Sequence, residues 1–163
     1  KLVEINDLKD EDMVVTVSSV GAPAAENRFV QPIDYVEAIR LLQKYTNTTP
    51  KALITNENGG SATINGLLQS AVLGIPVLDA PCNGRAHPTG VMGSMNLGQL
   101  QNYNSVQVAV GGYPGTDSRV SQIVEGSIDT SSKLVRQAAV EEGGRVAVAR
   151  NPISVAYLKE NAA

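Results

Sequence analysis

The sequence contains no tryptophan, a single phenylalanine and five tyrosines. So few aromatic rings leave little material for the stacking platforms on which proteins hold single-stranded nucleic acid. The formal net charge of −3 points the same way, because a phosphate backbone is held by a basic stripe. We therefore expect no nucleic-acid partner.

Cysteine and long apolar runs are also scarce. The one cysteine, Cys82, cannot form an internal disulfide, which fits a cytoplasmic location. The longest nearly apolar run covers residues 71–80 and is too short to span a bilayer, and no signal peptide is visible. We therefore expect a cytoplasmic protein without a membrane partner.

What the sequence does contain is typical of one α/β domain over residues 1–163. Hydrophobic residues make up 42% of the chain and charged residues 18%, and no internal repeat or linker interrupts it. Apolar runs predict strands at residues 13–17, 52–55, 77–79, 106–110, 120–124 and 146–149. Helical spacing predicts helices at residues 34–45, 131–142 and 153–160, and another that is capped by Ser61 or Thr63 and stops at Gly74. This alternation predicts a mostly parallel sheet flanked by helices.

In open parallel sheets, ligands bind outside the carboxyl ends of the strands. Three loops that follow predicted strands are rich in functional residue types: residues 18–26, residues 56–61 and the segment from Asp79 to His87. We therefore place the candidate site at this edge of the sheet.

Gly59 and Gly60 lie between a predicted strand and a predicted helix. Their N–H groups and the helix dipole could together hold a carboxylate, a phosphate or a developing oxyanion. The alternative is a plain strand-to-helix turn.

Glu57 and Asp79 end consecutive predicted strands, so two carboxylates would lie within reach of one substrate or metal. Paired carboxylates can share a proton and serve as acid and base. The same pair of carboxylates could instead bind a divalent metal ion. The alternative is that Asp79 caps a turn and Glu57 is solvated.

Arg85 and His87 lie in a segment broken by Gly84 and Pro88. Arginine offers a planar fork for a carboxylate, and His87 is the one histidine available for proton transfer. Arg85 could instead pair with a nearby carboxylate, and His87 could cap a helix or hold a buried hydrogen bond. Cys82 is a nucleophile only if its pKa is lowered, and is otherwise a small packed residue.

Three segments together resemble the S-methyl thiohydantoin desulfurase-like family: residues 56–60, residues 73–80 and residues 84–88. They are similar to its patterns E-x-G-G, G-x-P-x-x-D-x-D and G-R-A-x-P-E. Residues 21–26 resemble its G-x-P…E segment, and residues 123–126 and 136–144 its later I-E-G and R…G-G segments.

The resemblance implies an α/β amino-terminal domain and chemistry on a five-membered cyclic imide or thioimide related to hydantoin. It assigns the family's polar positions to Glu26, Glu57, Asp79, Gly84 and Arg85. The family's second aspartate is Pro81 or Cys82 here, and the glutamate after Pro88 is Thr89.

Two kinds of function follow from these observations. In the first, a hydrolase-type enzyme acts on a small cyclic amide, imide or thioimide, with Glu57, Asp79 and His87 as catalytic residues. Its substrate would be bound by the side chains and backbone groups of Glu26, Gly59, Gly60, Gly84 and Arg85. In the second, the chain is a non-catalytic small-molecule-binding domain, or a homo-oligomer or subunit that completes its site with a partner chain. The missing carboxylates favour the second.

Overall fold

The structure, a computed structural model, describes residues 1–21, 29–85 and 89–162. Its centre is a seven-stranded sheet in the order β1-β4-β3-β2-β7-β5-β6. The strands are β1 (Leu2–Val3), β2 (Met13–Gly21), β3 (Ala52–Glu57), β4 (Val77–Asn83), β5 (Ser105–Gly111), β6 (Val120–Gly126) and β7 (Arg145–Ser154). The α-helices are α1 (Pro32–Thr46), α2 (Leu67–Leu73), α3 (Ile128–Glu141) and α4 (Val155–Asn161). Within the described residues, none of the helices is both long enough and apolar enough to cross a membrane.

The sheet is mixed, which corrects the prediction of a mostly parallel one. Strands β1, β4, β3 and β2 pair in parallel, whereas β7 pairs antiparallel with both β2 and β5, and β6 pairs antiparallel with β5. The reason is the link between β5 and β6, which contains no helix. A short link of this kind joins antiparallel neighbours, and parallel neighbours need a longer crossover.

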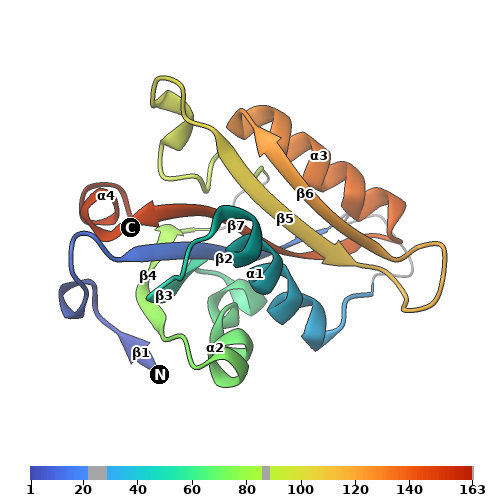
Figure 1. The fold of residues 1–163 in the computed structure, drawn as a ribbon, viewed down its shortest axis with the longest axis horizontal. Helices are drawn as coiled ribbons and strands as arrows, with labels where there is room; N and C mark the ends of the chain where they lie inside the picture. The colour runs from blue at the N-terminus through green and yellow to red at the C-terminus, as the bar shows by residue number, and fades with distance from the viewer. Residues whose placement is uncertain (22–28, 86–88, 163) are drawn as a thin grey trace.

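The last strand of the chain lies in the middle of the sheet. Figure 1 shows β7, in red, between β2, in blue, and β5, in yellow. Its register runs from Met13↔Ser154 to Gly21↔Arg145 on one side and from Gln107↔Arg150 to Gly111↔Val146 on the other. Strand β7 therefore joins the parallel part of the sheet to the antiparallel part.

The two faces of the sheet are covered by different helices. Val15, Val17, Leu53 and Val108 pack with Ile39 of α1 in one buried cluster. The alternate residues, including Ala109, Val146 and Val148, pack on the other face with Val135, Ala138 and Ala139 of α3. Because side chains alternate along a strand, this division fixes which face every other strand residue occupies.

Helix α1 begins where its sequence favours a start. Pro32 occupies the first turn, and the Asp34 carboxylate accepts a hydrogen bond from the Gln31 backbone N–H at 2.7 Å. The helix ends at Asn47, which has a left-handed conformation with φ of 51°. The predicted helix at residues 34–45 lies inside these limits.

The region after β3 differs from its prediction. A 3-10 helix, η2 (Gly60–Ile64), precedes α2, which begins only after Gly66. Thr63 does not cap α2, because its hydroxyl accepts from the Gly59 N–H at 3.0 Å. Gly74 ends α2 with φ of 72°, as its position predicts.

Candidate functional site

Polar residues gather on the α3 face of the sheet, on four neighbouring strands. Ser18 on β2, Asn56 on β3, Gln107 on β5 and Arg150 on β7 are all buried. Arg150 lies in register with both Thr16 and Gln107, so these side chains meet across adjacent strands. A cluster of hydrogen-bonding groups thus occupies a part of this sheet face where a buried sheet usually carries apolar side chains.

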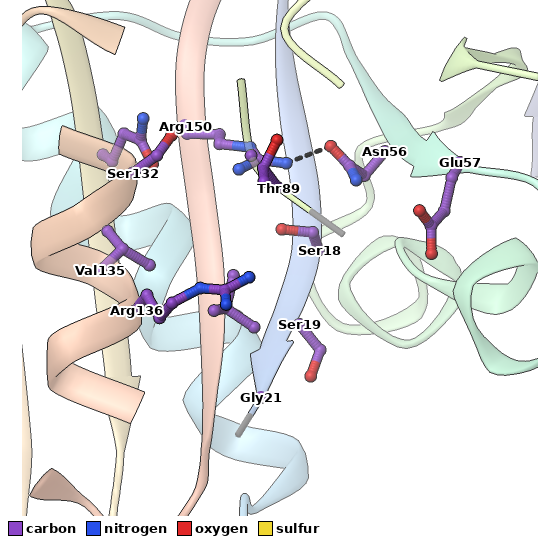
Figure 2. A pocket seen from close by; sticks show the side chains of 13 residues that line it. Ser18, Ser19, Gly21, Asn56, Glu57, Thr89, Ser132, Val135, Arg136 and Arg150 are labelled. Atoms are coloured by element: carbon purple, nitrogen blue, oxygen red, sulfur yellow. Dashed lines mark hydrogen bonds between the residues drawn. The ribbon is translucent and has the colours of Figure 1, made fainter. Parts of the chain in front are cut away.

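A cavity of about 320 Å³ lies over this cluster. Ser18, Asn56, Gln107 and Arg150 line it, with Ser132 from α3 on another side; its remaining walls are Ser19, Val20, Gly21, Glu57, Thr89, Gly90, Val135 and Arg136. Figure 2 shows the α3 side chains on one side, Asn56 and Glu57 on the other, and Arg150 between them. The volume is within the range of small-molecule sites, about 300–1,000 Å³.

Arg150 is the central charged group of this cavity. Its side chain is 2% exposed, and its Nη2 donates a hydrogen bond to the Asn56 Oδ1. Burial lowers the pKa of the guanidinium, while the nearby Cys82 and Glu57 raise it. An arginine still keeps its charge in a protein, so the cavity holds a buried cation.

A bulge in β7 helps to direct this side chain. The register between β2 and β7 shifts between Val14 and Thr16, opposite the stretch of β7 that contains Asn151. Asn151 has a positive φ of 50°, and its Oδ1 accepts from the Ser105 hydroxyl at 2.7 Å. Bulges occur often beside functional sites because they redirect a neighbouring side chain.

Several polar atoms of the lining residues are buried and have no hydrogen-bond partner in the part of the chain that the structure describes. They are the Ser18 and Ser132 hydroxyls, the Gln107 Oε1 and the Arg150 Nε. An unpaired buried polar group costs about 1–3 kcal/mol. Donors and an acceptor are thus left without partners around one cavity, which is the condition that a bound polar molecule would relieve.

Gly90 lies directly against the Arg150 guanidinium. A Cβ atom at this position would come within 2.7 Å of the Arg150 Nη1 and 2.8 Å of the Ser132 Oγ. Both distances are too short for real contacts, so any larger residue would displace these side chains. A glycine here allows the backbone to approach both polar groups.

Cys82 lies on the same face but is not a reactive thiol. It is buried, its Sγ lies 3.4 Å from the Thr16 hydroxyl, and burial raises its pKa to about 11. A thiol with this pKa stays protonated at neutral pH and is a poor nucleophile. Of the two alternatives for Cys82, the structure supports the packed residue.

The structure places one of the two predicted carboxylates at the cavity and the other outside its lining. Glu57 ends β3, lines the cavity and lies near enough to Arg150 to influence its pKa. Asp79 lies within β4 and not at its end, is exposed, and is not among the residues that line the cavity. Strand β4 continues for four residues past Asp79. The residue of β4 that pairs with Glu57 is therefore Asn83 and not Asp79. The expectation that both residues end their strands is therefore wrong for Asp79.

The predicted binding residues that the structure describes lie outside the cavity. Gly59, Gly60, Gly84 and Arg85 are exposed, and the Gly59 N–H is already bound by Thr63. The Arg85 N–H donates to the Asn83 Oδ1 at 3.4 Å. Glu26 and His87 fall outside the described residues.

A metal centre has no support among the described residues. Over residues 1–21, 29–85 and 89–162, no group of three or more His, Cys, Asp or Glu side chains could hold a metal ion. The cavity is lined instead by neutral polar groups with one carboxylate and two guanidinium groups, those of Glu57, Arg136 and Arg150.

The comparisons with known proteins agree with the resemblance seen in the sequence. The family model described as the S-Me-THD-like N-terminal domain matches residues 1–116. The chain belongs to this family. A search of curated proteins gives no match. The predicted relationship to the S-methyl thiohydantoin desulfurase-like family is thus confirmed.

A solved structure supports the fold. The chain is similar to a crystal structure of a protein from Chromobacterium violaceum, with a TM-score of 0.72 and 20% sequence identity. The similarity covers 99% of this chain and 44% of that protein. The S-Me-THD-like chain therefore spans less than half the length of this structural relative.

Several lining residues were not predicted as site residues. Arg150 directly follows the predicted strand at residues 146–149, and an arginine at the end of an apolar strand is the one local signal that could have indicated it. Gln107 lies inside a predicted strand, and Ser132 inside a predicted helix. Their convergence depends on β7 lying between β2 and β5, which the sequence pattern did not predict.

Proposed function

We propose that this cavity binds and hydrolyses a small cyclic amide, imide or thioimide of the hydantoin or thiohydantoin type. The observation that carries the proposal is the set of unpaired polar atoms around the cavity, which contains both donors and an acceptor. A cyclic imide presents alternating C=O and N–H groups along its edge. Gln107 Oε1 can accept from a ring N–H, and the Ser18 and Ser132 hydroxyls can donate to ring carbonyls. Membership in the S-Me-THD-like family supports the same class of ring.

In this proposal, Glu57 acts as the general base. Among the described lining residues it is the one carboxylate, and it lines the cavity at the end of β3. Glu57 takes a proton from a water molecule, and the water oxygen bonds to the ring carbon. The C–N bond of an amide, or the C–S bond of an S-alkylated thioimide, then breaks, and the proton passes to the leaving nitrogen or sulfur. The reaction needs no further reactant.

Turnover of a ring substrate tests this proposal. We expect the purified chain to consume S-methyl-2-thiohydantoin or hydantoin, followed by ring absorbance and by release of methanethiol or appearance of the ring-opened acid. Glu57→Gln should lower kcat about 100-fold or more while binding persists, as for loss of a general base. Glu160→Gln, an exposed carboxylate on α4, is the matched control and should leave kcat unchanged. Full activity in Glu57→Gln would contradict the assigned base.

A non-catalytic binding domain is the second candidate. Two observations favour it: the predicted Asp79 partner lies outside the cavity, and the chain corresponds to 44% of its structural relative. Binding of the same rings without turnover, measured by calorimetry, would support this candidate over the hydrolase. A partner chain that completes the site would appear as a complex in light scattering, with turnover restored only in that complex.

A further inference from the structure

The cavity contains a positive charge, that of Arg150, which forms no ion pair with a carboxylate among the described residues. The one hydrogen bond of the Arg150 guanidinium within the described residues is to the neutral Asn56, and no salt bridge there includes Arg150. Glu57 is close enough to raise its pKa but forms no ion pair with it. A buried charge without a partner is costly, and arginine cannot avoid the cost by losing its proton. Within residues 1–21, 29–85 and 89–162, Arg150 therefore has no directly paired counter-ion.

Arg150 also has N–H groups that make no hydrogen bond to the described residues. Its Nε is buried without a partner, and its Nη1 makes no hydrogen bond within the described residues. The Ser132 hydroxyl, also unpaired, lies close to the Nη1, because one Cβ at Gly90 would contact both. The Nη1 N–H groups and the neighbouring hydroxyl can each donate a hydrogen bond to an oxygen of one carboxylate.

We infer that the ligand of this cavity carries a permanent negative charge, and that Arg150 with Ser132 forms the subsite for it. The inference rests on the proposed ring-binding function and narrows its substrate class to cyclic imides or thioimides bearing a carboxylate substituent. A neutral ring would fill the cavity without giving Arg150 a counter-ion. Gly90 makes room for this subsite, because any side chain there would push the Nη1 and the Ser132 hydroxyl apart.

The test compares three probes on the same chain by calorimetry. Hydantoin-5-acetate carries both the ring and the carboxylate, hydantoin-5-acetamide carries the ring without the charge, and succinamate carries the carboxylate without the ring. We expect hydantoin-5-acetate to bind at least tenfold more tightly than either of the others, since charge-assisted hydrogen bonds contribute about 10- to 100-fold. Equal binding of the acetate and the acetamide would overturn the anionic subsite and leave the ring proposal standing. Equal binding of hydantoin-5-acetate and succinamate would overturn the ring proposal and leave the anionic subsite.

Two variants locate the subsite. Arg150→Met should reduce the preference for hydantoin-5-acetate over the acetamide to nearly one. Gly90→Ala retains every charge and should weaken acetate binding at least tenfold, so the inference stays testable even where Arg150→Met fails to fold. Arg40→Met removes an exposed arginine from α1 and is the control for the change in net charge. An unchanged preference in both Arg150→Met and Gly90→Ala would overturn the assignment to Arg150.

Discussion

Two arginines of this protein meet very different surroundings. Arg119 donates to the Asp34 carboxylate at 2.6 Å and to the Glu37 carboxylate at 2.9 Å, and its Nη1 also reaches the Gly111 carbonyl oxygen at 3.1 Å. Arg150 is more deeply buried, yet its protein partner is the amide of Asn56. Arg119 holds α1 against the antiparallel part of the sheet, whereas Arg150 faces a cavity. The difference separates a charge that the protein uses for its own structure from one that, as we propose, is used for a ligand.

The strongest way to test this contrast is to remove Arg119. Asp34 is fully buried and would be left without its counter-charge. We expect Arg119→Met to lower the free energy of unfolding by about 3 kcal/mol, near the low end for a broken buried pair, since the guanidinium is partly exposed. Urea unfolding measures the change. Lys133→Met, which breaks the exposed pair with Asp129, is the control and should cost less than about 0.5 kcal/mol. Equal small losses in both variants would show that the Arg119 pairs contribute little.

Removal of Arg150, in contrast, should not lower the free energy of unfolding. Methionine fills much of the same volume without the unpaired charge, so we expect Arg150→Met to leave the free energy of unfolding unchanged or to raise it by up to about 2 kcal/mol. The same urea experiment compares it directly with Arg119→Met. A loss as large as that of Arg119→Met would mean that Arg150 is a structural residue, and the contrast between the two arginines would fail.

Glu142, which precedes β7, should have a smaller effect on stability that depends on pH. Burial raises the pKa of Glu142 and the charge of Arg119 lowers it in part, while the Glu142 Oε2 has no hydrogen-bond partner among the residues described. An acid whose pKa is raised by folding contributes stability below its unfolded pKa of about 4.3 and loses it as pH rises through the folded value. We therefore expect Glu142→Gln to be more stable than the parent above that range, with a flatter pH dependence. Melting temperatures from pH 4 to pH 8 measure this, and parallel curves for the two proteins would contradict it.

Much of the fold was predictable because its signals are local. Gly74 ends α2, Pro32 begins α1, and each predicted strand lies within an observed one. The direction of β7 was not predictable in this way, because pairing with β2 and β5 is decided by contacts distant in sequence.

The candidate site was only partly predictable for the same reason. Glu57 was a candidate because it comes shortly after the apolar run at residues 52–55, and the structure places it at the end of β3 and in the lining of the cavity. Asp79 follows the apolar pair Val77-Leu78 in the same way, but β4 continues to Asn83 and leaves Asp79 in the middle of the strand. Gln107 and Ser132 carried no sequence signal at all, since isolated polar residues within helices and strands are common. They became candidates only once the structure showed that each has a buried polar atom without a partner among the described residues.

The central place of β7 also governs how the chain can assemble. Until residues 145–154 are available, no strand joins β2 to β5, and each of the two presents an unpaired edge. During synthesis the parallel strands emerge first, but the sheet cannot close around its core before the last strand inserts between them. Contacts so distant in sequence slow folding and prolong the exposure of unpaired strand edges, which are prone to aggregation. Residues 1–116, the part matched by the family model, end before β6 and β7, so that segment alone lacks both the strand that completes the sheet and the arginine at its cavity.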